Sequence, residues 1–187
     1  MAAFALITLS VVVLTGWAGQ VSLGQMSFVG TGAAVGAVAT HTWHFDMSLA
    51  LLVAGLAGAV VAVVVGLPAL RQPGLYLAVT TLALALASSN FLLNRAEQTW
   101  IPRDGLERPD LFKTYDLSSE AAMYWFVLGV VVLGFLAVAG IRRSRTGRTL
   151  LAVRDNERGA AAYAIPVLRA KLTGFALSGF LAAVAGC

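Results

Sequence analysis

The chain contains 187 residues, of which 59% are hydrophobic and 12% are charged, and its mean hydropathy is +0.83. This composition excludes an ordinary globular domain and indicates a polytopic membrane protein built as an all-α transmembrane helical bundle. The net charge of +4 does not indicate nucleic-acid binding, because the basic residues are concentrated in one segment between apolar runs and no aromatic residues alternate with them. The single cysteine, Cys187, excludes a disulfide within the chain and a cysteine metal site.

Apolar runs alternate with polar segments along the whole chain, and a helix needs about 20 residues to cross a bilayer. The runs cover residues 2–18, 26–40, 47–66, 75–93, 121–141 and 172–187. Pro68, Pro73 and Gly74 follow the third run, and we expect them to end its helix. The first run has no charged leader and the last is shorter than a span, so we expect residues 1–187 to be one transmembrane domain cut at both ends.

A polar, glycine-rich segment separates the first two runs. Its small and polar residues are Gly16, Gly19, Gln20, Ser22, Gly24, Gln25, Ser27 and Gly30. Because lipid offers no hydrogen-bond partners, such a backbone at membrane depth must be buried in protein or line a water-filled path. The pattern leaves two interpretations open, a translocation path and an interfacial turn whose small residues serve helix packing. Hydropathy also leaves open whether residues 2–40 form two spans or one span and a re-entrant half-helix.

The segment from residue 142 to residue 171 holds eight of the thirteen Lys and Arg residues, namely Arg142, Arg143, Arg145, Arg148, Arg154, Arg158, Arg169 and Lys171. A short loop this basic belongs on the cytoplasmic side, because Lys and Arg near span ends resist translocation. By alternation, the loop around Arg71 is also cytoplasmic, whereas residues 41–46 and 94–120 are extracytoplasmic. Residues 94–120 carry four basic and six acidic residues, and this balanced charge suits the outer face.

The basic loop has features of two short helices. Thr146 is placed to cap a helical turn from Gly147 to Arg154, because its hydroxyl can accept from an unpaired backbone N–H. Asp155 is placed to cap a second helix from Asn156 to Ala164, and Pro166 forbids its continuation. A short Ala-rich helix with charges near its start suits docking into a partner's groove, and the alternative is that the loop only fixes the topology.

Several kinds of chemistry have no counterpart in the sequence. No phosphate-binding loop of the Gly-x-x-x-x-Gly-Lys-Ser/Thr type is present, so the chain is not expected to bind ATP itself. No acidic residue lies within a predicted span, which argues against a proton-relay transporter. We interpret Asp155 and Glu157 as capping and docking residues rather than as a catalytic pair. His41 and His44, near Asp46, could form only a weak metal site, and we favour an interfacial loop.

Two stretches resemble the permease subunits of branched-chain amino acid ABC transporters. Residues 16–24 read Gly-Trp-Ala-Gly-Gln-Val-Ser-Leu-Gly and match the family signature, which interrupts the membrane helices near the translocation path. Gln25 follows where the family usually has His. The second stretch is similar to the family's cytoplasmic coupling loop, which contacts the ATPase subunit, although Ala164 stands where the family usually has Gly. It consists of Gly147-Arg148, residues 152–157, Ala160-Ala161, Lys171-Leu172 and residues 175–182.

The resemblance implies a transporter subunit of ABC importer permease type, with broken or re-entrant helices, rather than an enzyme. It implies a translocation path near Gly19, Gln20, Ser22, Gly24, Gln25 and Ser27. It implies ATPase contacts at Gly147, Arg148, Arg154, Asp155, Asn156 and Glu157. The implied partners are a second permease subunit, two cytoplasmic ATPase subunits that hydrolyse ATP, an extracytoplasmic substrate-binding protein and an amino-acid substrate.

The implied location is the bacterial cytoplasmic membrane, with residues 94–120 as an extracytoplasmic loop and residues 142–171 as the cytoplasmic coupling loop. No cofactor or metal is implied. Two alternatives stay open. The first is a permease of the same family for urea or short amides. The second is a membrane scaffold without a path, which leaves the polar segment after residue 16 unexplained.

Overall fold

The computed structural model describes residues 2–70, 75–88, 90 and 120–187, and within these ranges the chain is mostly helical and contains no β-strand. The expectation of an all-α bundle is therefore confirmed. The helices are α1 (Ala2–Val11), which continues into the π-helical segment η1 (Val12–Trp17), α2 (Gln25–His41), α3 (Met47–Ala69), α4 (Leu75–Ala87), α5 (Glu120–Arg143), α6 (Arg145–Asp155), α7 (Glu157–Ala162) and α8 (Val167–Gly186).

Three of the described helices, α3, α5 and α8, are long and apolar enough to cross a membrane. The 23 residues of α3 reach about 34 Å at the rise of an α-helix, slightly more than a hydrocarbon core of about 30 Å. The predicted span 47–66 is three residues too short, because Pro68 lies inside the last turn and α3 continues to Ala69. Pro68 cannot donate to the carbonyl of Val64, four residues before it, and the helix ends one residue later.

Some predicted segments differ from the structure or lie outside the described residues. The last helix, α8, begins at Val167 directly after Pro166 rather than at residue 172. The helix α4 accounts for most of the predicted run 75–93. Residues 91–93, the loop around Arg71 and residues 94–119 of the predicted outer loop lie outside the part of the chain that the structure describes.

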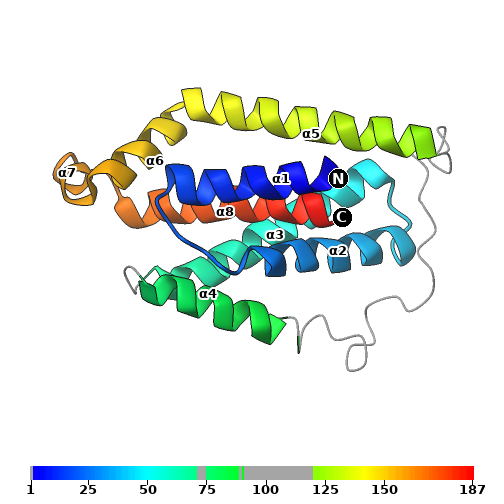
Figure 1. Cartoon of the computed structure of the whole chain (residues 1–187), viewed down its shortest axis with the longest axis horizontal. Coiled ribbons are helices and arrows are strands. Elements are labelled where there is room, and N and C mark those ends of the chain that lie inside the picture. The colour runs from blue at the N-terminus through cyan, green and yellow to red at the C-terminus, as the bar shows by residue number, and fades with distance from the viewer. Residues whose placement is uncertain (1, 71–74, 89, 91–119) are drawn as a thin grey trace.

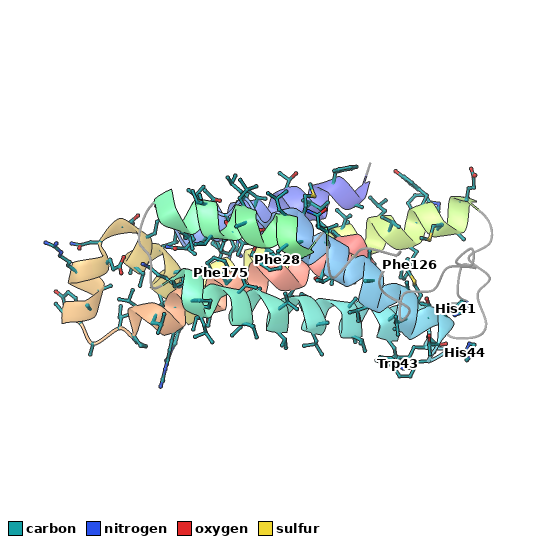
Figure 2. All side chains as sticks on the ribbon, turned by 90° about the horizontal axis from the view of Figure 1, so that it is seen from below. Phe28, His41, Trp43, His44, Phe126 and Phe175 are labelled. Atoms are coloured by element: carbon teal, nitrogen blue, oxygen red, sulfur yellow. The ribbon has the colours of Figure 1, made fainter. Side chains whose placement is uncertain are left out.

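The helix α8 lies at the centre of the bundle, in contact with α1, α2 and α3 (Figure 1). Its residues Phe175 and Ser178 are fully buried, and Phe28 of α2 is also buried. Figure 2 shows Phe28 and Phe175 within the interior of the bundle, whereas His41, Trp43 and His44 lie at one end. The core is thus assembled around α8 from segments far apart in the sequence.

Close packing of α3 on α8 depends on a pair of glycines. A Cβ atom added to Gly58 would lie 2.7 Å from the carbonyl oxygen of Gly179, and a Cβ atom added to Gly179 would lie 2.7 Å from the carbonyl oxygen of Gly58. Small residues allow two helix backbones to touch, which favours helix association inside a bilayer.

The described connections alternate between the two ends of the bundle. Figure 1 shows α6 and α7 at the end where α3 finishes and α4 starts, and we call this the α6 end. The turn between α2 and α3 and the start of α5 lie at the opposite end (Figure 1).

Candidate functional site

The polar segment between the first two apolar runs is an interruption of helical structure. Residues 18–24, between the end of η1 and the start of α2, are not helical. The side chain of Gln25 bonds Ser10 of α1 and Ser178 of α8, and both serines lie well inside their helical runs. The helix α2 therefore starts at mid-depth, and residues 18–24 lead there from the α6 end (Figure 1). Residues 2–40 thus contain a re-entrant break rather than two regular spans.

Gln25, Ser10 and Ser178 form a buried polar cluster where α1, α2 and α8 meet. Nε2 of Gln25 donates to Oγ of Ser10 at 2.8 Å and to Oγ of Ser178 at 2.6 Å. Oγ of Ser178 donates to the carbonyl oxygen of Ser10 at 2.9 Å, and Oγ of Ser10 donates to the carbonyl oxygen of Ile7 at 2.6 Å. Each hydroxyl proton is thus used on a backbone carbonyl, so each serine can only accept from the amide.

The same cluster contains a buried acceptor without a partner. Gln25 is 6% exposed, and its Oε1 atom is buried and accepts no hydrogen bond from the described residues. An unpaired buried acceptor costs free energy, so the two hydrogen bonds of Gln25 alone do not account for an amide at this position.

The segment is also attached to α4. The backbone N–H of Leu23 donates to Oγ1 of Thr81 at 3.2 Å. A Cβ atom on Gly24 would lie 2.7 Å from the carbonyl oxygen of Thr81, so only glycine allows this close approach. The first turn of α2 is closed by Ser27, whose Oγ donates to the carbonyl oxygen of Gly24 at 2.9 Å. The mid-depth end of the segment is therefore held by α4 as well as by α1 and α8.

At the α6 end, the segment contacts the basic loop. Nη1 of Arg154 donates to the carbonyl oxygen of Gly16 at 2.5 Å. Gly19 has φ +65, and a Cβ atom there would lie 2.9 Å from Cγ of Arg154. Leu150 and Val153 on the same helix are buried in the core. The helix α6 is thus docked on the end of η1 and on the turn that follows it.

The helix caps of the basic loop differ from those that we predicted. The helix α6 begins at Arg145 with Ser144 as its cap, and α7 begins at Glu157 with Asn156 as its cap. The prediction of Thr146 as the first cap is wrong because only Ser144 separates α5 from α6, so α6 starts before Thr146. The prediction of Asp155 as the second cap is wrong because Asp155 is the last residue of α6, whereas Asn156 has the extended backbone of a cap (φ −153, ψ 95). The second helix ends at Ala162, before the predicted Ala164.

The two acidic residues of the loop are paired with bases inside the loop. Asp155 is paired with Arg154 at 2.7 Å, and Glu157 with Lys171 at 2.7 Å. Arg148 and Arg158 remain exposed on the same loop. Since its carboxylates are already paired, the exposed surface of α6 and α7 is predominantly basic.

A cavity of about 270 Å³ lies between η1, α5 and α8, away from the polar segment. Its lining is entirely apolar, with Val13, Trp17, Ala137, Val138, Ile141, Leu177, Phe180 and Leu181. A zwitterionic solute would lose its hydration there without gaining hydrogen bonds. Among the described residues, no group of three or more His, Cys, Asp or Glu side chains could hold a metal ion.

The structure divides the predicted path residues into two groups. Gly24, Gln25 and Ser27 are buried at mid-depth, whereas Gly19 is exposed and Gln20 and Ser22 are half-buried between the α6 end and that point. The sequence analysis named Gly16 only as part of the polar segment, and it did not assign Ser10, Thr81 or Ser178 to the site. Ser10 and Thr81 are hydroxyl residues within apolar runs, and their burial depends on helix packing that local sequence does not show.

Comparison with known proteins identifies the family. The family model for branched-chain amino acid transport system permease components matches residues 1–187. The high-affinity branched-chain amino acid transport system permease protein LivM of Escherichia coli is 29% identical over 198 residues, which cover 93% of this chain and 47% of the relative. LivM of Salmonella typhimurium matches with the same identity and coverage. No solved structure matches the chain significantly.

The chain spans about half the length of the curated relatives that it matches. Together with the apolar helices, the family match supports a multi-pass membrane protein. The match extends over the interrupted segment, the buried amide cluster and the basic loop alike. The chain therefore belongs to the family of branched-chain amino acid transport system permease components.

Proposed function

We propose that the chain is the membrane-spanning permease subunit of an ATP-driven ABC importer in the bacterial cytoplasmic membrane. Its substrates are branched-chain or related amino acids. It works with a second permease subunit, two cytoplasmic ATPase subunits and an extracytoplasmic substrate-binding protein. The family match and the relatives named LivM support this proposal.

The interrupted helix is the observation that carries the proposal. Residues 18–24 bring non-helical backbone, with Gln20 and Ser22, from the α6 end to the middle of the bundle. Non-helical backbone at membrane depth is tolerated where it is buried in protein or lines a water-filled cavity. Gln20 and Ser22 are half-buried, and we expect them to face the solute. Gln25 and Ser27 are buried at the start of α2, and we expect them to hold this end of the segment in place.

The basic loop 142–171 is the surface that we expect to meet an ATPase subunit. Its short helices α6 and α7 project from one end of the bundle (Figure 1). Arg148 and Arg158 are exposed there, and the carboxylates of Asp155 and Glu157 are already paired within the chain. Charge complementarity therefore favours an acidic groove on the ATPase. In this arrangement, residues 94–120 face the binding protein on the outer side.

A reconstitution experiment tests the proposal. The tagged protein is purified from its native membrane in mild detergent, its partners are identified by mass spectrometry, and the complex is placed in proteoliposomes. We expect an ATPase subunit and a second permease subunit in the complex, and uptake of labelled leucine that requires ATP and the binding protein. Uptake of urea in place of leucine would instead identify short amides as the substrate class. A complex with no ATPase would contradict the proposal.

A further inference from the structure

Arg154 links the basic loop to the interrupted helix by two separate contacts. Its guanidinium donates to the carbonyl oxygen of Gly16, in the last turn of η1, where the helix leaves carbonyl groups without helical partners. A cation is also favoured at the negative end of a helix dipole. The aliphatic stem of Arg154 lies against Gly19, where a Cβ atom would come within 2.9 Å of Cγ. One side chain thus holds both the end of η1 and the turn after it.

Asp155 fixes the direction of this side chain. Its Oδ1 atom accepts from Nε of Arg154 at 2.9 Å and from Nη2 at 2.7 Å. With these two donors occupied, Nη1 is the end of the planar guanidinium that points at Gly16. The Arg154 head group is therefore turned toward the permease core rather than toward a partner, although the side chain is 42% exposed.

The far end of the interrupted segment is held equally firmly. The backbone N–H of Leu23 is bonded to Thr81 of α4, and Gly24 packs against the carbonyl of the same residue. The next residue, Gln25, is bonded to Ser10 and Ser178. The seven residues 18–24 thus lie between contacts with Arg154 of α6 at one end and contacts with α1, α4 and α8 at the other. As long as these contacts hold, a displacement of α6 relative to the bundle either stretches this short segment or moves the start of α2.

We infer that Arg154 is a positioning residue that transmits displacement of the α6–α7 loop to residues 18–24 and to the start of α2. This inference rests on the proposed function, since the displacement is the one that an ATPase subunit imposes. It reassigns Arg154 and Asp155 from docking contacts to an internal link. Arg148 and Arg158 remain as docking residues, because their side chains are exposed on the loop.

The test compares Arg154→Gln with Arg158→Gln in the assembled transporter. Both changes remove one positive charge from the loop, but Arg158 makes no hydrogen bond or ion pair with the residues that the structure describes. For Arg154→Gln we expect normal co-purification of the ATPase, continued ATP hydrolysis, and a fall of roughly 2- to 30-fold in solute transported per ATP. For Arg158→Gln we expect weaker co-purification, with transport per ATP unchanged in the complexes that form.

Two further variants separate transmission from a merely structural role. Arg154→Lys keeps the charge but lacks the planar guanidinium whose separate ends bond Asp155 and Gly16, so its transport per ATP is expected to fall between wild type and Arg154→Gln. Gly19→Ala disturbs the same contact from the other side and forces a side chain into φ +65. It should lower transport per ATP, and the double variant with Arg154→Gln should be no worse than the stronger single variant.

The outcomes distinguish this inference from the proposed function. Wild-type transport per ATP in Arg154→Gln, within an intact complex, would overturn the inference alone. Loss of ATPase co-purification in Arg154→Gln, with coupling unchanged in the residual complex, would also overturn it and would return Arg154 to a docking role. Absence of any ATPase from the wild-type complex would contradict the proposed function, and the inference with it.

Discussion

At the scale of single residues, the side-chain amide of Gln25 has a nitrogen atom with two hydrogen bonds and a buried oxygen atom with none from the described residues. Its Nε2 atom has two serine acceptors, while its Oε1 atom has no partner. Hydrogen bonds between membrane helices contribute only about 0.6 kcal/mol on average, whereas a buried unpaired acceptor costs about 1–3 kcal/mol. The amide therefore adds little net stability, and its role must be sought in function or in specifying how the helices pack.

This balance predicts that Gln25→Leu is tolerated by the fold. The variant loses two hydrogen bonds and the unpaired acceptor together, so its free energy of unfolding is expected to change by no more than about 1 kcal/mol. Gln25→Glu has the same size but carries two acceptor oxygens, which would face serine oxygens in a buried place. It should lose at least about 2 kcal/mol. Thermal unfolding in detergent measures both, and equal losses in the two variants would contradict the argument.

Gly24 provides a second prediction at this scale. In Gly24→Leu, the new side chain meets the backbone of Thr81, and overpacking of this kind costs about 1–3 kcal/mol. We expect uptake to be abolished while insertion into the membrane is unchanged, because the apolar spans are not altered.

Gly140→Leu is the matched control, since a Cβ atom at Gly140 meets no atom within 4 Å among the described residues. It should transport as the wild type does. Normal uptake by Gly24→Leu would show that the close approach of α2 and α4 has no part in transport.

At the scale of helices, the basic loop shows how backbone conformation selects one of two possible helix caps. Asp155 and Asn156 are both good capping residues, and spacing alone does not choose between them. Asp155 ends α6 in helical backbone, whereas Asn156 has the extended backbone of a cap and accepts from the backbone N–H of Gly159 at 2.8 Å. The second helix of the loop consequently starts one residue later than we predicted.

The caps can be tested by hydrogen exchange. Asn156→Ala removes the cap of α7 and is expected to cost about 1 kcal/mol of local helix stability, so the amides of α7 should exchange faster. Thr146→Ala is the control, because Thr146 is exposed and makes no side-chain hydrogen bond with residues that the structure describes. Faster exchange in α7 for Thr146→Ala than for Asn156→Ala would contradict the assignment.

The helices themselves could be predicted from the sequence, whereas the site could not be assembled from it. Hydropathy reveals runs such as 47–66 and 121–141 because nearly every residue of a membrane span must be apolar. The glycines and amides of the break are visible because they are costly at that depth. The partners of Gln25 and Arg154 lie up to 153 residues away in the sequence, and such pairings depend on helix packing that local spacing does not encode.

At the scale of the whole molecule, the described bundle presents an apolar surface that requires a bilayer or further protein around it. Only 11% of the apolar window of α5 is buried, compared with 44% for α8. On α3, exposed apolar residues recur every three or four positions, at Leu49, Leu52, Leu56, Val60, Val64 and Leu67. Such a stripe occupies one face of the helix, so that α3 packs on α8 by one side and meets apolar surroundings on the other.

The orientation of the bundle can be measured with single cysteines. Cys187 is the only native cysteine, so Cys187→Ser provides a background for His44→Cys and Arg158→Cys, two exposed positions at opposite ends. We expect a membrane-impermeant maleimide to label His44→Cys in cells with a permeabilised outer membrane. It should label Arg158→Cys only after the inner membrane is opened. The reverse pattern would place the basic loop outside and remove the basis for an ATPase contact.

The link between Gly16 and Arg154 also bears on how the protein is made. These residues are 138 positions apart, and at ribosomal speeds of about 5–20 residues per second the arginine is synthesised on the order of ten seconds after the glycine. During that time, the carbonyl of Gly16 and the turn at Gly19 lack their native contacts with Arg154. Ser178, which completes the Gln25 cluster, is synthesised later still. The helices α1 and α2 therefore enter the bilayer well before they reach their final shape.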